Sequence, residues 1–181
     1  LACRIPKPKR MTLAHMLNQN GKLIGDFTLA NLGPLKTGSY DEFFIVGSGI
    51  AEEFHMRWFE ENLNWNRSNQ NYETVRIIPH GIGKVGLHVA GPNSRKLMEK
   101  ITDADISSEA FRFMDIQEIN IGIVSCMVGR VSFTGELGYE IWMTPDKQHY
   151  VMDLLQTVGK EFDLRLFGLR ALNSLRLEKN Y

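Results

Sequence analysis

The sequence has few cysteines and no excess of charge of either sign. Its 181 residues include 2 cysteines, and Lys+Arg and Asp+Glu both number 21. Cys3 and Cys126 match neither a disulfide framework nor the spacing of a zinc site. A net charge of zero leaves no broad electrostatic field that would attract nucleic acid or an anionic membrane. We therefore expect a small neutral or zwitterionic ligand as the partner, with no nucleic acid and no membrane.

Long hydrophobic runs are also absent. No stretch approaches the roughly 18 apolar residues that a membrane span needs, and residues 1–10 lack the apolar centre of a signal peptide. The 5 histidines have no ligand spacing, so we predict no metal site. We expect a cytoplasmic protein, or one of the mitochondrial matrix if the source is eukaryotic. The chain begins without methionine and ends inside a predicted helix, so residues 1–181 are expected to be an internal fragment.

The pattern of apolar residues predicts an α+β fold with mainly antiparallel sheets and packed helices. The predicted strands share alternating or β-branched runs and cover residues 11–17, 22–31, 42–46, 75–78, 85–90, 118–121, 123–133 and 139–143. The predicted helices cover residues 50–63, 91–102, 144–162 and 168–181. Asn20-Gly21 predicts a tight hairpin, and the polar run 64–73 predicts a surface loop. Ile50, Phe54 and Trp58 have helical spacing and are predicted to form a buried stripe.

Residues Gly81 to Gly86 satisfy the GxGxxG pattern of dinucleotide-binding proteins. That mechanism requires a helix directly after the glycines, because the helix N-terminus faces the pyrophosphate. Residues 87–90 are predicted to form a strand instead. We therefore interpret these residues as turn glycines.

Two carboxylates lie inside predicted strands, where such residues are uncommon and costly to desolvate. Alternation places Asp26 on one face of its strand, with Phe27 and Leu29 on the other. Glu140 shares a face with Trp142, and a carboxylate next to a large aromatic can line a site for a flat heterocycle. The alternative is that both carboxylates lie on solvated faces.

Three segments resemble, in order and spacing, those of the glycine-cleavage T-protein (aminomethyltransferase) superfamily. They are GKLIGDFT at 21–28, FTGELGYE at 133–140 and LNSLRLEK at 172–179. The resemblance implies the folate-binding domain fold of that superfamily, incomplete here, with tetrahydrofolate as the cofactor. It places the family's catalytic aspartate on Asp26 and its pterin-binding glutamate on Glu140.

The chemistry of these two positions agrees with the resemblance. A pterin offers a ring N–H and an exocyclic amino group side by side, and the Glu140 carboxylate can accept hydrogen bonds from both. Near the N5 and N10 edge, Asp26 can take a proton and stabilise positive charge. We expect the hairpins at 20–21 and 133–140 to lie in one sheet region, with Asp26 and Glu140 facing one cavity.

Departures from the T-protein pattern indicate a branch of the superfamily. Leu13 and Phe133 replace two tyrosines and, by resemblance, provide apolar walls of the folate site. Leu172 aligns with a folate-contacting arginine of the T-proteins. The ending 173–179 resembles the dimethylglycine and sarcosine dehydrogenases, which fuse the folate domain behind a flavin-dependent one. This implies FAD in a missing N-terminal half, an N-methylated amine as substrate, and capture of its iminium as 5,10-methylenetetrahydrofolate.

Three alternatives remain open at this point. The first is a stand-alone aminomethyltransferase of glycine cleavage or a related folate-dependent demethylase. The second is a regulatory relative that kept the fold without the flavin chemistry. The third is a structural interface domain whose carboxylates are solvated.

Overall fold

The computed structural model describes residues 1–35, 38, 40–69 and 75–180. The chain divides into two compact units, Leu1–Ile82 and Gly83–Tyr181. Each unit contains one antiparallel sheet with helices, so the predicted α+β architecture is confirmed.

The sheet of the first unit has the order β1-β2-β3 and is formed by β1 (Arg10–Leu17), β2 (Leu23–Pro34) and β3 (Asp41–Val46). All neighbours are antiparallel. The β1–β2 connection is the tight turn that the Asn-Gly pair predicted. Gly21 has a φ of 73°, and the side-chain oxygen of Asn18 accepts hydrogen bonds from the backbone N–H groups of Asn20 and Lys22. This local chemistry explains why the hairpin can be found in the sequence.

A short 3-10 turn, η1 (Gly49–Ala51), leads into helix α1 (Glu52–Asn69). The predicted buried stripe is wrong, because Ile50 lies in the 3-10 turn and is 96% exposed. Starting the helix at Glu52 turns a different face toward the sheet. The ring centroids of His55 and Phe59 lie 4.8 and 5.7 Å from that of Phe27.

Two further predictions in the last part of the first unit are corrected. Helix α1 continues to Asn69, so residues 64–69 of the predicted surface loop are helical, and 70–73 lie outside the described residues. The predicted strand 75–78 is not formed, since residues 75–80 have no regular secondary structure. At the GxGxxG pattern, η2 (Gly81–Gly83) is followed after Lys84 by a strand and not by a helix, in agreement with our interpretation as turn glycines.

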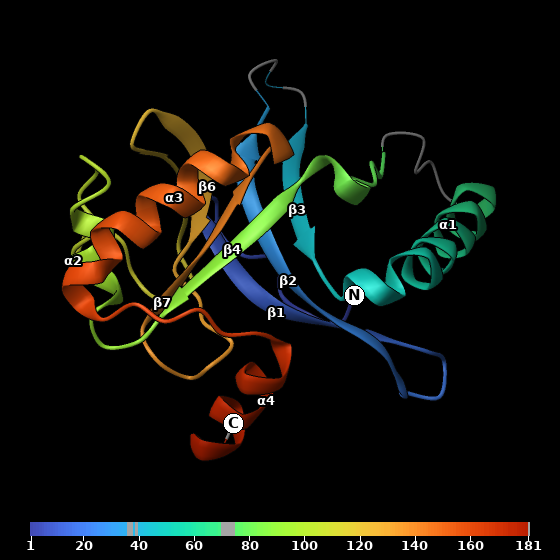
Figure 1. Ribbon diagram of the computed structural model, residues 1–181. Coiled ribbons are helices and arrows are strands. Elements are labelled where there is room, and N and C mark those ends of the chain that lie inside the picture. The colour runs from blue at the N-terminus through green and yellow to red at the C-terminus, as the bar shows by residue number, and fades with distance from the viewer. Residues whose placement is uncertain (36–37, 39, 70–74, 181) are drawn as a thin grey trace. The chain divides into compact units, whose positions relative to one another are not determined.

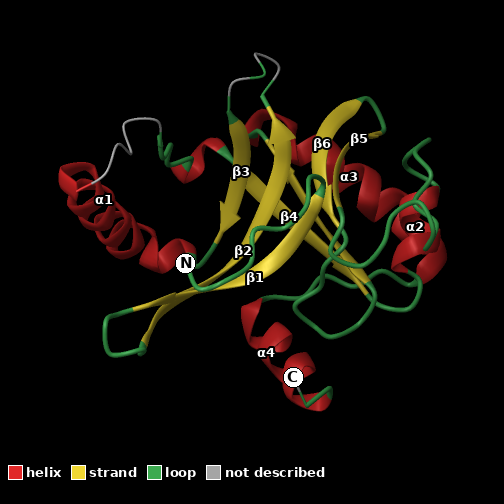
Figure 2. Cartoon of the chain, turned by 180° about the vertical axis from the view of Figure 1, so that it is seen from behind, coloured by secondary structure: helices red, strands yellow, loops and turns green. Residues whose placement is uncertain are grey.

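The sheet of the second unit has the order β4-β7-β6-β5. Its strands are antiparallel: β4 (Val85–Ala90), β5 (Ile116–Ile121), β6 (Val124–Gly129) and β7 (Gly138–Met143). Its helical segments are α2 (Ser94–Glu99), η3 (Pro145–Lys147), α3 (Gln148–Gly159), η4 (Lys160–Phe162) and α4 (Leu169–Glu178). Figure 1 shows α3 lying across the strands of this sheet, and Figure 2 shows the same layers from behind.

The core of the second unit lies between this sheet and α2 and α3. Tyr139, Ile141 and Met143 of β7 are fully buried there and contact Val151 and Leu155 of α3 as parts of one cluster. Burying a large apolar side chain contributes about 1.5–3 kcal/mol, so this face anchors β7 firmly. Since side chains alternate along a strand, the residues between them point to the other face of the sheet.

Candidate functional site

Asp26 lies on the outer face of β2 in the first unit. Its register partner on β1 is His15, and the next pair on the same face is Leu13 with Thr28. His15 and Asp26 are exposed, and Leu13 is 54% exposed. Within the described part of the chain, no side chain forms a hydrogen bond or ion pair with the Asp26 carboxylate. The carboxylate and the apolar Leu13 are therefore both available to a ligand on this face.

The opposite face of β2 holds Asp26 in place. Phe27 is buried against α1, and Gly25 lies directly against the ring of His55. A Cβ on Gly25 would lie 2.6 Å from Nε2 of His55, so a side chain at this position would require one of the two residues to move. The absence of a side chain at Gly25 thus allows α1 to pack against the strand next to Asp26.

Glu140 lies on β7 in the second unit, on the sheet face opposite the helical core. Its register partners are His88 on β4 and Gly129 on β6, which has no side chain. Burial raises the pKa of the Glu140 carboxyl from its ordinary 4.5 to about 7. Among the residues that the structure describes, none hydrogen-bonds to this carboxylate. A half-buried carboxylate without a donor can accept the paired N–H groups of a ligand.

Trp142 shares the Glu140 face and is buried. Its register partner on β4 is Gly86, and a Cβ there would lie 3.2 Å from Cδ1 of the indole. The last glycine of the GxGxxG pattern therefore makes room for the tryptophan next to Glu140. Sequence reasoning placed Trp142 correctly on this face but did not find the role of Gly86.

Sequence reasoning also missed His88, which lies directly opposite Glu140. Burial lowers the pKa of its imidazole below the ordinary 6.5, which favours the neutral form of the ring. Its Nε2 lies 3.3 Å from Oγ of Ser132, which in turn lies 2.8 Å from Oγ1 of Thr134. The sequence marks His88 only as a histidine within a predicted strand, since the pairing with β7 depends on register.

Phe133 lies in the β6–β7 connection and packs on α4. The guanidinium carbon of Arg176 lies 4.1 Å from its ring centroid, and the ring is 42% exposed. Beside it, Nζ of Lys179 forms an ion pair of 2.6 Å with Glu136. One face of the predicted apolar wall is thus stacked on a cation, which fixes the ring orientation.

An open groove of about 1410 Å³ lies within the second unit, between β4 and the segment that leads through η4 to α4. His88, Thr134, Phe167 and Leu172 line it, together with apolar side chains of α4. Within residues 1–35, 38, 40–69 and 75–180, no group of three or more His, Cys, Asp or Glu side chains could hold a metal ion.

The structure assigns the two predicted carboxylates to different units and different sheets. The hairpin at 20–21 belongs to the β1-β2-β3 sheet, whereas the 133–140 connection belongs to the β4-β7-β6-β5 sheet. Our expectation of one sheet region for both hairpins is therefore wrong, because each carboxylate has its own sheet. A common cavity for Asp26 and Glu140 stays a prediction.

Comparison with known proteins gives one family match over nearly the whole chain. The family model described as GCVT N-terminal domain matches residues 2–181. Human mitochondrial dimethylglycine dehydrogenase is 29% identical over 177 residues, which cover 98% of this chain and 19% of the human protein. An aminomethyltransferase of Halothermothrix orenii is 34% identical over 166 residues, covering 92% of this chain and 42% of that protein. The chain thus spans about a fifth of the length of the human dehydrogenase and less than half of the length of the aminomethyltransferase.

A solved structure shows the same fold. The heterotetrameric sarcosine oxidase of Corynebacterium sp. U-96, in complex with pyrrole 2-carboxylate, matches with a TM-score of 0.54. The match covers 78% of this chain and 64% of that chain at 14% sequence identity, so it supports the fold alone. None of the helices in the described part of the chain is long and apolar enough to span a membrane.

Proposed function

This chain belongs to the family of the GCVT N-terminal domain, and on that premise we propose that it binds a reduced folate and transfers a one-carbon unit onto it. The one-carbon unit comes from an iminium derived from an N-methylated amine. The observation that carries the proposal is Glu140, whose carboxylate has no hydrogen-bond donor among the described residues. It lies between His88 and Gly129 in the sheet, on the same face as Trp142.

The surroundings of Glu140 fit a pterin. The ring N–H and the exocyclic amino group of a pterin can donate side by side to one carboxylate, which supplies the donors that Glu140 lacks. Trp142 provides an aromatic side chain on the same face, and Gly129 leaves the β6 side free of a side chain. The cost of burying the carboxylate is offset when the ligand donates two hydrogen bonds to it.

Asp26 is the proposed catalytic residue. When bound, a reduced folate supplies two amine nitrogens, N5 and N10, which bond to the iminium carbon while their two protons leave with the released amine. We assign to Asp26 the acceptance of the N5 proton and its return to the departing amine nitrogen. Its carboxylate also stabilises the positive charge of the iminium. Leu13 and Phe133 are the proposed apolar walls.

We further propose that the chain acts with an FAD-dependent amine-oxidising domain. In that arrangement FAD in the other domain would supply the two-electron oxidation of the N-methyl group, and this domain captures the iminium before water hydrolyses it to formaldehyde. The name and length of the human dehydrogenase support this arrangement, since the chain corresponds to 19% of that protein. Proximity is the main catalytic contribution, because it turns a bimolecular capture into a positioned one.

A second candidate is the aminomethyltransferase reaction without a flavin. The 34% identity to the Halothermothrix orenii protein favours it. Absorbance of the purified full-length protein between about 350 and 500 nm distinguishes the two, because a bound oxidised flavin absorbs in this range and a protein without flavin does not.

The binding proposal is tested by calorimetry with tetrahydrofolate and the full-length protein. We expect Glu140→Gln to weaken binding by roughly 1.5–3 kcal/mol, because a charge-assisted acceptor is lost while the volume is kept. Glu118→Gln is the matched control, since Glu118 is an exposed carboxylate of the same sheet and should leave affinity unchanged. Unchanged affinity in a folded Glu140→Gln protein would remove this residue from the site.

A further inference from the structure

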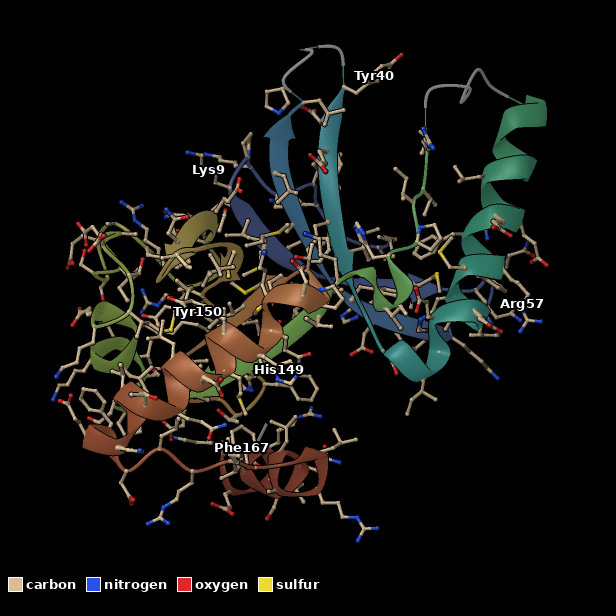
Figure 3. All side chains as sticks on the ribbon, turned by 45° about the horizontal axis from the view of Figure 1, so that its top comes forward. Lys9, Tyr40, Arg57, His149, Tyr150 and Phe167 are labelled. Carbon is tan, nitrogen blue, oxygen red and sulfur yellow. The ribbon has the colours of Figure 1, made fainter. Side chains whose placement is uncertain are left out.

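His88 and Glu140 form a directly opposed pair on the β4 and β7 strands. Directly opposed side chains in an antiparallel sheet lie on one face, with Cβ atoms roughly 4.5–5.5 Å apart. The imidazole also contacts Phe167, whose ring centroid lies 6.1 Å away in an edge arrangement. Figure 3 labels Phe167 in the segment that leads into α4.

The hydrogen bonds behind His88 determine which nitrogen carries its proton. Thr134 is 2% exposed, and its hydroxyl oxygen already accepts the backbone N–H of Glu136. Because buried hydroxyl protons are normally paired, we assign Thr134 as the donor to Oγ of Ser132, 2.8 Å away. Oγ of Ser132 also accepts the backbone N–H of Thr134, so we assign the Ser132 hydroxyl as the donor to Nε2 of His88, 3.3 Å away. A neutral imidazole has one proton, so this assignment places it on Nδ1.

The resulting pair presents a donor beside an acceptor. In the described residues, Nδ1 of His88 has no hydrogen-bond acceptor and the Glu140 carboxylate has no donor. A matching ligand edge carries a hydrogen-bond acceptor next to two donors. A 2-amino-4-oxopyrimidine ring has this edge, with its carbonyl oxygen on one side of the ring N–H and its amino group on the other.

We propose that His88 is a specificity-determining residue, which donates from Nδ1 to the 4-oxo oxygen of the heterocycle held by Glu140. The inference rests on the proposed folate function and adds a second recognition group to it. A 4-amino ring presents a donor at the same place, so the imidazole N–H opposes it. The Ser132–Thr134 pair acts through His88 by keeping the proton on Nδ1.

The test compares dissociation constants for tetrahydrofolate and for its 4-amino-4-deoxy analogue in the full-length protein. The measured quantity is the preference, defined as the dissociation constant of the analogue divided by that of tetrahydrofolate. A substitution that weakens the binding of both compounds equally leaves this ratio unchanged. We expect His88→Phe, which keeps a ring without a donor, to lower the preference by about threefold to tenfold. His88→Asn retains an N–H donor and should recover most of it.

Two variants separate this role from a structural one. Ser132→Ala leaves the imidazole in place but removes the group that orients its proton, so it should also lower the preference. His149→Phe, on the exposed surface of α3 in Figure 3, is the control and should not change it. An unchanged preference in both folded His88→Phe and Ser132→Ala would overturn the role of His88. If the wild type binds neither compound, the proposed function fails instead.

Discussion

Glu140 combines a proposed role in ligand binding with a cost to stability. The carboxyl is anchored by fully buried neighbours on both sides in β7, and its own face offers no hydrogen-bond donor within the described residues. Burial therefore favours the protonated form and raises the pKa to about 7. A buried group that lacks a partner in the free protein is typical of a binding or catalytic site.

The pH dependence of stability tests this interpretation. The folded state keeps the Glu140 proton between pH 4.5 and about 7, whereas the unfolded chain has lost it, so stability falls as pH rises through this range. Glu140→Gln removes this loss. We expect the variant to be more stable than wild type at about pH 8, by about 2–3 kcal/mol at most, and similar to it at about pH 4.

Thermal unfolding of both proteins at these pH values provides the measurement, with Glu118→Gln as the control for an exposed carboxylate of the sheet. A variant that is destabilised at both pH values would show that Glu140 has a structural partner. Reduced folate should narrow the difference at high pH, because it binds only the wild-type carboxylate strongly.

At the scale of elements, the contact between β2 and α1 supports Asp26. Phe27 packs on His55 and Phe59, and Gly25 admits the His55 ring. The strand next to the proposed catalytic carboxylate is thus anchored from behind by one helix face. Asp26 itself does not contribute to that packing, since it lies on the exposed face.

A glycine substitution tests this contact. Gly25→Ala places a methyl group against Nε2 of His55 and should destabilise the protein by about 1–3 kcal/mol through overpacking. Combining it with His55→Ala should recover part of the loss, since the two residues are in contact. Gly49→Ala is the matched control, because nothing lies within 4 Å of its added Cβ. Equal stability of Gly25→Ala and wild type in urea unfolding would show that α1 does not press on this strand.

A second contact between elements joins the β6–β7 connection to α4. Arg176 stacks on Phe133, and Lys179 pairs with Glu136, so two contacts join the helix to the connection that precedes Glu140. Within Leu169–Glu178, all of which is described, no residue is buried. Helix α4 therefore contributes contacts that position the β6–β7 connection, and it adds no buried side chain to the core.

At the scale of the whole molecule, the two carboxylates belong to two units with different proposed tasks. Asp26, in Leu1–Ile82, is assigned to proton transfer, and Glu140, in Gly83–Tyr181, to holding the heterocycle. We therefore expect Asp26→Ala to impair one-carbon transfer and Glu140→Gln to weaken folate binding. If both variants weakened folate binding and neither impaired transfer, this division would be wrong.

The Asp26→Ala variant tests the transfer step in the full-length protein. Because Asp26 is exposed and has no partner among the described side chains, thermal stability should stay almost unchanged. Amine oxidation should continue, while formation of methylenetetrahydrofolate falls by about a hundredfold or more. Free formaldehyde should appear in its place. Quantifying both products for wild type and variant checks this, and equal partitioning would exclude Asp26 from the mechanism.

Features set by neighbours in the chain could be predicted. The Asn-Gly turn at Gly21 follows from backbone chemistry, and strand β4 was predicted with the bounds Val85–Ala90 that it has. Predictions failed where tertiary packing determines whether a segment pairs as a strand or becomes buried. Residues 75–78 have a strand-like composition but no regular secondary structure, and Ile50 is exposed because α1 begins two residues after it.

By itself the sequence determined the α+β class, the family, and the positions of Asp26 and Glu140 within strands, because turn residues, alternation and ordered motifs are local properties. Only the tertiary structure decided that the two residues belong to separate sheets and that His88 lies opposite Glu140. Strand register joins residues 52 positions apart here, and no local pattern encodes it. The same holds for the raised pKa of Glu140, since burial depends on everything that packs around the carboxyl and not on its neighbours in the chain.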